Sequence, residues 1–243
     1  MTDQSTRMPL ATVALIAGSS LLIMVMAAPF AELFVFPKLV VAQNPAQTAK
    51  NIIANQPLFV AGIGAYLITF IGDLIVTWAL YLLLKPVHEN LSLLAAWFRL
   101  IFAVIALVAL LNLLTVFRLL MTTDYSAVLE PKQLHTQATL CLNAFRSGFH
   151  FGIIFFAIHL VLVGYLVIKA SYIPNSVGIL LIITGLGYVL TSLKPYLFPT
   201  TNLNFVQYTY YGELIFMGWL LIKGSRLRAV DNQNLLKNEV SSI

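Results

Sequence analysis

Six long apolar runs occupy most of this 243-residue sequence. A helix that spans a membrane needs roughly 20 mainly apolar residues. Runs of that length are predicted at residues 9–36, 58–84, 91–121, 149–169, 173–194 and 203–223. The runs are continuous, whereas a membrane β-barrel shows alternating segments of about ten residues. The sequence therefore predicts an all-α, polytopic membrane protein that folds as a six-transmembrane-helix bundle.

The composition agrees with a membrane environment. Charged residues make up only 9% of the chain, whereas soluble domains carry about 25%. Residues 1–224 are predicted to form the transmembrane domain and residues 225–243 a polar cytoplasmic tail, which leaves no room for a separate soluble domain. The net charge of +5 comes from basic residues beside the apolar runs. This placement predicts contact with the headgroups of the lipid bilayer and not with nucleic acid.

The basic residues also predict the orientation of the chain. Lys223, Arg226 and Arg228 follow the last run, where the positive-inside rule counts most. Both termini are therefore expected in the cytoplasm, with the protein in the plasma or inner membrane of the cell. The apolar stretch after Arg7 is too long for a cleavable signal, so the first span is expected to be retained.

Prolines and polar segments predict where the helices end and what lies between them. Pro37 is expected to end the first helix, and Pro86 is expected to follow the end of the second. The mostly polar segment 44–55 is predicted to form a short interfacial helix. Residues 131–146 are predicted to be helical and to continue into the fourth span.

Asp73 is the clearest ionisable residue inside a span. It lies twelve residues before Lys85, which places it roughly 18 Å from that membrane face and near the centre of a core about 30 Å thick. The same side of the helix carries Gly62, Tyr66, Thr69 and Thr77. Because polar groups are costly in lipid, this stripe is predicted to face the interior of the bundle.

Arg99 lies eight residues into the third run and is predicted to pair with Asp73. Its face of the helix carries the small residues Ser92, Ala95, Ala103 and Ala106, which are typical of close helix contacts in membranes. The pair has two interpretations. It either fixes only the register of two helices or belongs to a site that binds an anionic or polar ligand.

His159 and Glu213 each lie ten residues before an exit lysine, Lys169 and Lys223 respectively. Their equal depth predicts one protonation-sensitive site, provided that the fourth and sixth spans are neighbours. The alternatives are a hydrogen-bonded packing histidine and a protonated glutamic acid bound to an adjacent helix. Tyr188, on a polar face of the fifth run, could supply that partner.

Glu32 follows Pro29 near the outer end of the first run, where it is predicted to be an entrance group within reach of water. No metal site and no cofactor are predicted. Cys141 is the only cysteine, and His150 and His159 fall on opposite faces of one helix. The sequence also lacks a phosphate-binding loop, a zinc-binding HExxH motif and a GxSxG nucleophile elbow.

Several segments resemble one family of membrane proteins. They are residues 48–52, 85–100 and 148–166, together with Ile173-Pro174, Gly178, residues 185–188 and Gly212-Glu213-Leu214. The chain is similar over most of its length to a bacterial family catalogued as domain of unknown function 4386. The resemblance implies a shared fold, and it implies no activity, substrate or catalytic residue.

Three functions are compatible with these residues. The first is binding, transport or sensing of a small polar molecule, an ion or a proton at a midplane layer made by Asp73, Arg99, His159, Tyr188 and Glu213. The second is a membrane-embedded enzyme that acts by acid and base or through a metal on a lipid-derived substrate. The third is a structural or accessory subunit. A polar cavity that reaches the layer favours the first function, and a dry, filled interior favours the third.

Overall fold

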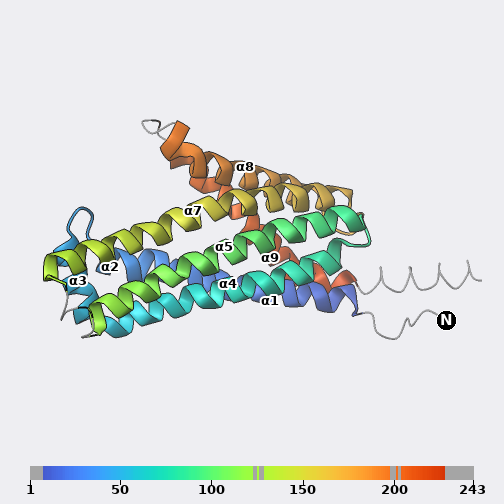
Figure 1. Ribbon diagram of the computed structural model, residues 1–243. Coiled ribbons are helices and arrows are strands. Elements are labelled where there is room, and N and C mark those ends of the chain that lie inside the picture. The colour runs from blue at the N-terminus through green and yellow to red at the C-terminus, as the bar shows by residue number, and fades with distance from the viewer. Residues whose placement is uncertain (1–7, 123–124, 126–128, 198–200, 202–203, 228–243) are drawn as a thin grey trace, which may run out of the picture. The chain divides into compact units, whose positions relative to one another are not determined.

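The computed structural model describes residues 8–122, 125, 129–197, 201 and 204–227, and the regular secondary structure within them is helical. This confirms the predicted all-α class. Figure 1 traces the elements by colour: α1 (Leu10–Pro29), η2 (Phe30–Val35), α2 (Phe36–Leu39), α3 (Pro45–Ala54), α4 (Gln56–Leu84), α5 (Glu89–Met121), α7 (Pro131–Lys169), α8 (Asn175–Leu197), η3 (Asn204–Tyr210), α9 (Tyr211–Lys223) and η4 (Gly224–Leu227).

Five helical stretches in the described part of the chain are long and apolar enough to cross a membrane. They are Leu10–Leu39, Gln56–Leu84, Glu89–Met121, Pro131–Lys169 and Asn175–Lys194. Helices of this kind satisfy every backbone polar group internally, which is what lipid requires. They indicate a multi-pass membrane protein.

The predicted sixth span differs from the other five. Its start, Leu203, lies outside the described residues, and the stretch that follows is the 3-10 helix η3. The α-helix α9 has only 13 residues, which at 1.5 Å per residue cover roughly 20 Å of a core about 30 Å thick. Glu213 consequently lies in the first turn of α9, not in the middle of a long helix.

The first helix does not end at Pro37 as predicted. A π-helical turn, η2, follows Pro29, and α2 then continues to Leu39 with Pro37 in its first turn. Proline fits there because its fixed φ is helical and because the first turn of a helix does not need its N–H. The chain leaves the helix at Val40, whose backbone is extended.

The other locally predicted helices and helix ends are confirmed, whereas the interfacial position of segment 44–55 stays a prediction. Segment 44–55 contains α3, and the Asn44 side chain caps it by accepting a hydrogen bond from the Gln47 N–H at 3.0 Å. Helix α7 begins at Pro131 and is continuous through the fourth span, and α4 ends at Leu84, just before Pro86. Of the predicted tail, residues 228–243 lie outside the described part of the chain.

The chain divides into two compact units, and α1, α4, α5 and α7 each contribute to both. The first unit contains residues up to 22 and residues 73–100, together with the chain from 153 onward. In it, α7 and α8 approach closely at a pair of glycines. A Cβ atom added to Gly164 would lie 2.6 Å from the Gly178 carbonyl oxygen, and one added to Gly178 would lie 2.5 Å from the Gly164 oxygen.

The second unit contains residues 23–72 and 101–152, and aromatic rings fill its interior. The ring of buried Tyr66 lies 5.0–6.4 Å, centroid to centroid, from four phenylalanines. These are Phe36, Phe70, Phe145 and Phe149. Small residues allow α5 and α7 to pack beside this cluster, because a Cβ on Gly148 would meet the Ala109 Cβ at 3.0 Å. Gly148 therefore marks a packing contact between α7 and α5.

Candidate functional site

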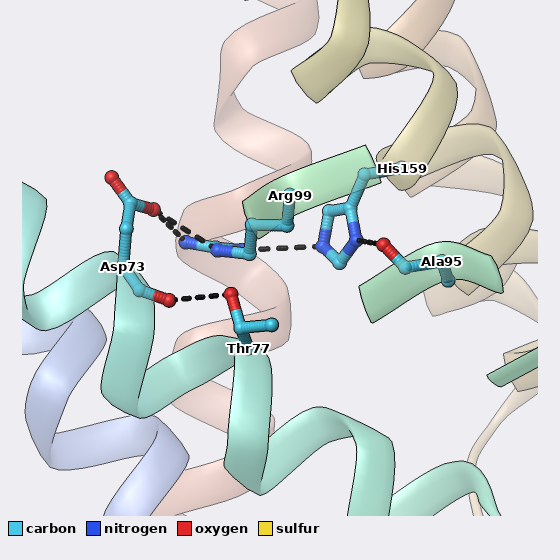
Figure 2. Close-up of polar contacts among 5 residues, drawn as sticks. All are labelled: Asp73, Thr77, Ala95, Arg99 and His159. Atoms are coloured by element: carbon cyan, nitrogen blue, oxygen red, sulfur yellow. Dashed lines mark hydrogen bonds and ion pairs between the residues drawn. The ribbon is translucent and has the colours of Figure 1, made fainter. Parts of the chain in front are cut away.

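The polar centre of the first unit is an ion pair between Asp73 of α4 and Arg99 of α5. One carboxylate oxygen, Asp73 Oδ1, accepts hydrogen bonds from Arg99 Nη2 at 2.6 Å and from Arg99 Nε at 3.0 Å. Each side chain is only 2% exposed. The connection between α4 and α5 is short, so the two helices are neighbours and the predicted pair forms. Figure 2 shows the guanidinium lying between Asp73 and His159.

His159 of α7 continues this chain of polar contacts. Its Nδ1 lies 2.8 Å from the backbone oxygen of Ala95, and its Nε2 lies 3.3 Å from Arg99 Nη1 (Figure 2). A carbonyl oxygen can only accept and an arginine N–H can only donate. The Nδ1 atom therefore carries the hydrogen, and the Nε2 atom accepts from Arg99. The imidazole links α7 to two points on α5.

An aromatic ring covers the guanidinium. The Cζ atom of Arg99 lies 5.0 Å from the centre of the Phe156 ring, a cation–π contact. The same ring stacks on His159, with centroids 5.9 Å apart and planes at 26°. Sequence reasoning missed Phe156, although its position three residues before His159 on one helix face was an available signal.

The polar stripe on α4 faces inward, as predicted. Tyr66, Thr69, Asp73 and Thr77 are all buried. The threonine hydroxyls, however, donate to their own helix: Thr77 Oγ1 to the Asp73 carbonyl oxygen at 2.7 Å, and Thr69 Oγ1 to the Ala65 oxygen at 2.9 Å. This bonding leaves their donor hydrogens unavailable to a ligand.

Glu213 meets Tyr188 in the same unit. The Tyr188 hydroxyl on α8 donates a hydrogen bond to the Glu213 carboxylate on α9. The Tyr188 ring also stacks on Tyr210, with centroids 4.5 Å apart and planes at 12°. Tyr210 in turn donates to Thr191 Oγ1 at 3.1 Å. These contacts hold the junction between η3 and α9 against α8.

A small cavity lies between Glu213 and the Arg99–His159 pair. Arg99, His159 and Glu213 line it together with the apolar residues Leu21, Leu80, Leu160, Val163, Leu181 and Phe216. The centre of a water-sized sphere can occupy about 10 Å³ of it, which is about the space that one water molecule needs. The Glu213 carboxylate also interacts electrostatically with Arg99 and Asp73. Five of the six candidate residues thus lie in one cluster.

A second hollow that His159 lines is too small for a water molecule. This hollow, lined also by Thr77, Ser92, Ala95 and their apolar neighbours, has no room for a water-sized sphere. Within the described residues, no three His, Cys, Asp or Glu side chains are grouped closely enough to hold a metal ion. His150 is exposed and His159 is buried, as expected for opposite faces of one helix.

Glu32, the sixth candidate residue, belongs to the second unit. It lies in the π-helical turn η2, its side chain is exposed, and its Oε1 accepts a hydrogen bond from the Tyr66 hydroxyl at 2.6 Å. Proline at position 29 immediately precedes this turn, and turns of this kind are frequent at functional sites. Glu32 therefore has a partner that the sequence did not identify.

Comparison with known proteins places these residues in a family. The model of domain of unknown function 4386 (DUF4386) matches residues 16–224. The chain belongs to the DUF4386 family. The match contains every candidate residue from Glu32 to Glu213, and the predicted tail lies beyond it.

A relative of this DUF4386 chain comes from Archaeoglobus fulgidus and is described as an uncharacterized protein. It is 34% identical over 175 residues, which cover 72% of this chain and 90% of the relative. The expectation of a bacterial family is therefore too narrow, since the relative is archaeal. No solved structure matches the chain.

Proposed function

We propose that this DUF4386 protein binds and releases a proton inside the membrane, with Glu213 as the group that gains and loses it. The observation that carries the proposal is the cavity between Glu213 and the Arg99–His159 pair, which has room for about one water molecule. A proton can move through a single bridging water. A larger polar ligand or a lipid-derived substrate does not fit in the cavity.

Each of the five clustered residues has its own role in this proposal. Asp73 is held by two hydrogen bonds from Arg99, so its carboxylate serves as the fixed counter-charge. Tyr188 donates to Glu213 and orients it. His159, whose Nε2 faces Arg99, lines the same cavity as Glu213. A water molecule in the cavity would accept the proton that Glu213 releases and return it, and the charge of Arg99 and the neutral imidazole of His159 would stay unchanged.

A structural role is the competing function, and the filled space beside Thr77 and Ser92 favours it. Among the described residues, the Oγ of Ser192 is the one buried side-chain polar atom without a hydrogen-bond partner. Pairing of all the other buried side-chain polar atoms there is what a cluster that only holds helices together would show. The two functions differ in whether Glu213 exchanges a proton.

Infrared difference spectroscopy of the purified protein in lipid tests this exchange. As the pH is lowered, the wild type is expected to develop the carbonyl band of a protonated carboxylic acid, and Glu213→Gln should lose that band completely. His159→Gln should move the pH at which the band appears, because His159 lines the same cavity.

Glu89→Gln is the matched control, since Glu89 is exposed and paired with Lys85 at 2.9 Å. This variant should keep the band. A band that survives Glu213→Gln, or titrations that coincide in the wild type and His159→Gln, would assign the cluster a structural role.

The proposal includes a topology. Together η3 and α9 provide a helical stretch from Asn204 to Lys223, which we propose as the sixth span of the bundle. An even number of spans places both termini on one side. The basic residues at and after the end of α9 support a cytoplasmic position for that side, in a cell membrane, with residues 225–243 as a polar tail.

Cysteine accessibility from outside the cell tests the topology. In a Cys141→Ser background, Ala127→Cys between α5 and α7 should be labelled by a membrane-impermeant reagent, and Val230→Cys in the tail should not. The reverse pattern would invert the topology, and labelling of both would leave an odd number of spans.

A further inference from the structure

The second unit carries two opposite charges around one tyrosine hydroxyl. Glu32 accepts a hydrogen bond from Tyr66 at 2.6 Å. Arg146 of α7 lies close enough to act electrostatically on the same hydroxyl. Both charged side chains are exposed, whereas Tyr66 is buried at 2% exposure and held among phenylalanine rings. A rigid, buried group therefore positions an outward-facing carboxylate.

The depth of these residues places them near the headgroups of a lipid leaflet. Glu32 lies roughly 11 Å along the helix from the midpoint of the Leu10–Leu39 stretch. The hydrocarbon core ends about 15 Å from its own midplane. Arg146 lies roughly 35 Å along α7 from Lys169, which ends that helix. This distance is close to the full thickness of the core, so Arg146 lies at a headgroup boundary too.

The surroundings of Glu32 are apolar and exposed. Its own helical stretch presents Met26 at 70%, Leu33 at 69% and Phe34 at 58% exposure, a surface suited to acyl chains. An ionised carboxylate at the edge of lipid is costly unless a cation neutralises it. No ion pair joins Glu32 to a lysine or arginine within the described residues. The Glu32 carboxylate is therefore available to the cationic group of a lipid.

We propose that Glu32 and Arg146 bind the headgroup of a zwitterionic phospholipid that carries a primary ammonium, such as phosphatidylethanolamine. The ammonium contacts Glu32, the phosphate contacts Arg146, and the acyl chains lie on the exposed apolar side chains of α1 and η2. Tyr66 acts as a positioning residue for the carboxylate. This inference does not depend on proton exchange at Glu213, which lies in the other unit.

Competition for lipid, read by native mass spectrometry of the full-length protein, tests the site. The protein is mixed with equal amounts of phosphatidylethanolamine and phosphatidylglycerol, which share the phosphate and differ in the ammonium. The wild type should retain phosphatidylethanolamine in roughly fivefold preference, the factor that a partly exposed ion pair supplies. Glu32→Gln should abolish the preference, and Arg146→Gln should lower the retention of both lipids.

Controls distinguish the loss of lipid binding from a folding defect and from the binding of another ligand. Glu32→Gln keeps an oxygen that can accept from Tyr66, so its melting temperature should match that of the wild type, and Glu89→Gln should keep the lipid preference. The proposal is overturned if the wild type shows no preference or if Glu32→Gln retains it. It is also overturned if soluble phosphoethanolamine displaces the lipid at equal concentration. A dimer that Glu32→Gln dissociates, with lipid retention unchanged, would overturn it as well, because the partner of Glu32 would then be a second copy of the chain.

Discussion

Neutralising either member of the Asp73–Arg99 pair is expected to lower the free energy of unfolding by roughly 3–5 kcal/mol. In Asp73→Asn the guanidinium of Arg99, which is 2% exposed, loses its counter-charge, and in Arg99→Gln the carboxylate does. A buried charge without a partner is the source of the cost. Thermal unfolding of the purified protein in detergent, calibrated against a denaturant series, measures it.

The double variant Asp73→Asn/Arg99→Gln separates the pair from its surroundings. It leaves no unpaired charge between the two positions, so it should cost clearly less than the sum of the single changes. Glu89→Gln breaks the exposed pair with Lys85 and should not change stability measurably. A double variant as unstable as the sum of the two single changes would contradict the pair.

Adding a methyl group at the contact between α7 and α8 is expected to destabilise the protein by roughly 1–3 kcal/mol. In Gly164→Ala the new Cβ would lie 2.6 Å from a backbone oxygen and 3.0 Å from a backbone nitrogen of α8. Backbone atoms cannot rotate away as a flexible side chain can, so the helices must separate. Gly178→Ala fills the same contact from the other side and should behave alike.

Gly218→Ala in α9 is the matched control. A Cβ at Gly218 would meet no atom within 4 Å, so this change should leave stability unaltered or raise it by up to about 1 kcal/mol through helix propensity. Because Gly164→Ala and Gly178→Ala disturb one contact, their double variant should cost less than their sum. Equal melting temperatures for Gly164→Ala and Gly218→Ala would show that the contact is looser than described.

Predictions that rest on periodicity and depth succeeded for identifiable reasons. Lipid offers no hydrogen bonds to the backbone, so the apolar runs had to be helices. A polar stripe costs too much to face lipid, so Asp73 had to turn inward. Arg99 follows on the next helix after a short connection, which leaves it few other partners. The boundary at Pro37 was predicted wrongly because a π-helical turn shifts the register before it.

Other features depend on which helices are neighbours, and one chain's periodicity does not contain that information. Equal depth placed Glu213 and His159 at one level, yet only the packing of α9 against α8 brings Glu213 to Tyr188. The contact of Phe156 with Arg99 and that of Tyr66 with Glu32 likewise join helices through space. The sequence by itself determined the helices, their inward faces and the Asp73–Arg99 pair, because these follow from the cost of polar groups in lipid. The tertiary structure decided the small cavity and the partners of Glu213 and Glu32, because these follow from side-chain shapes where separate helices meet.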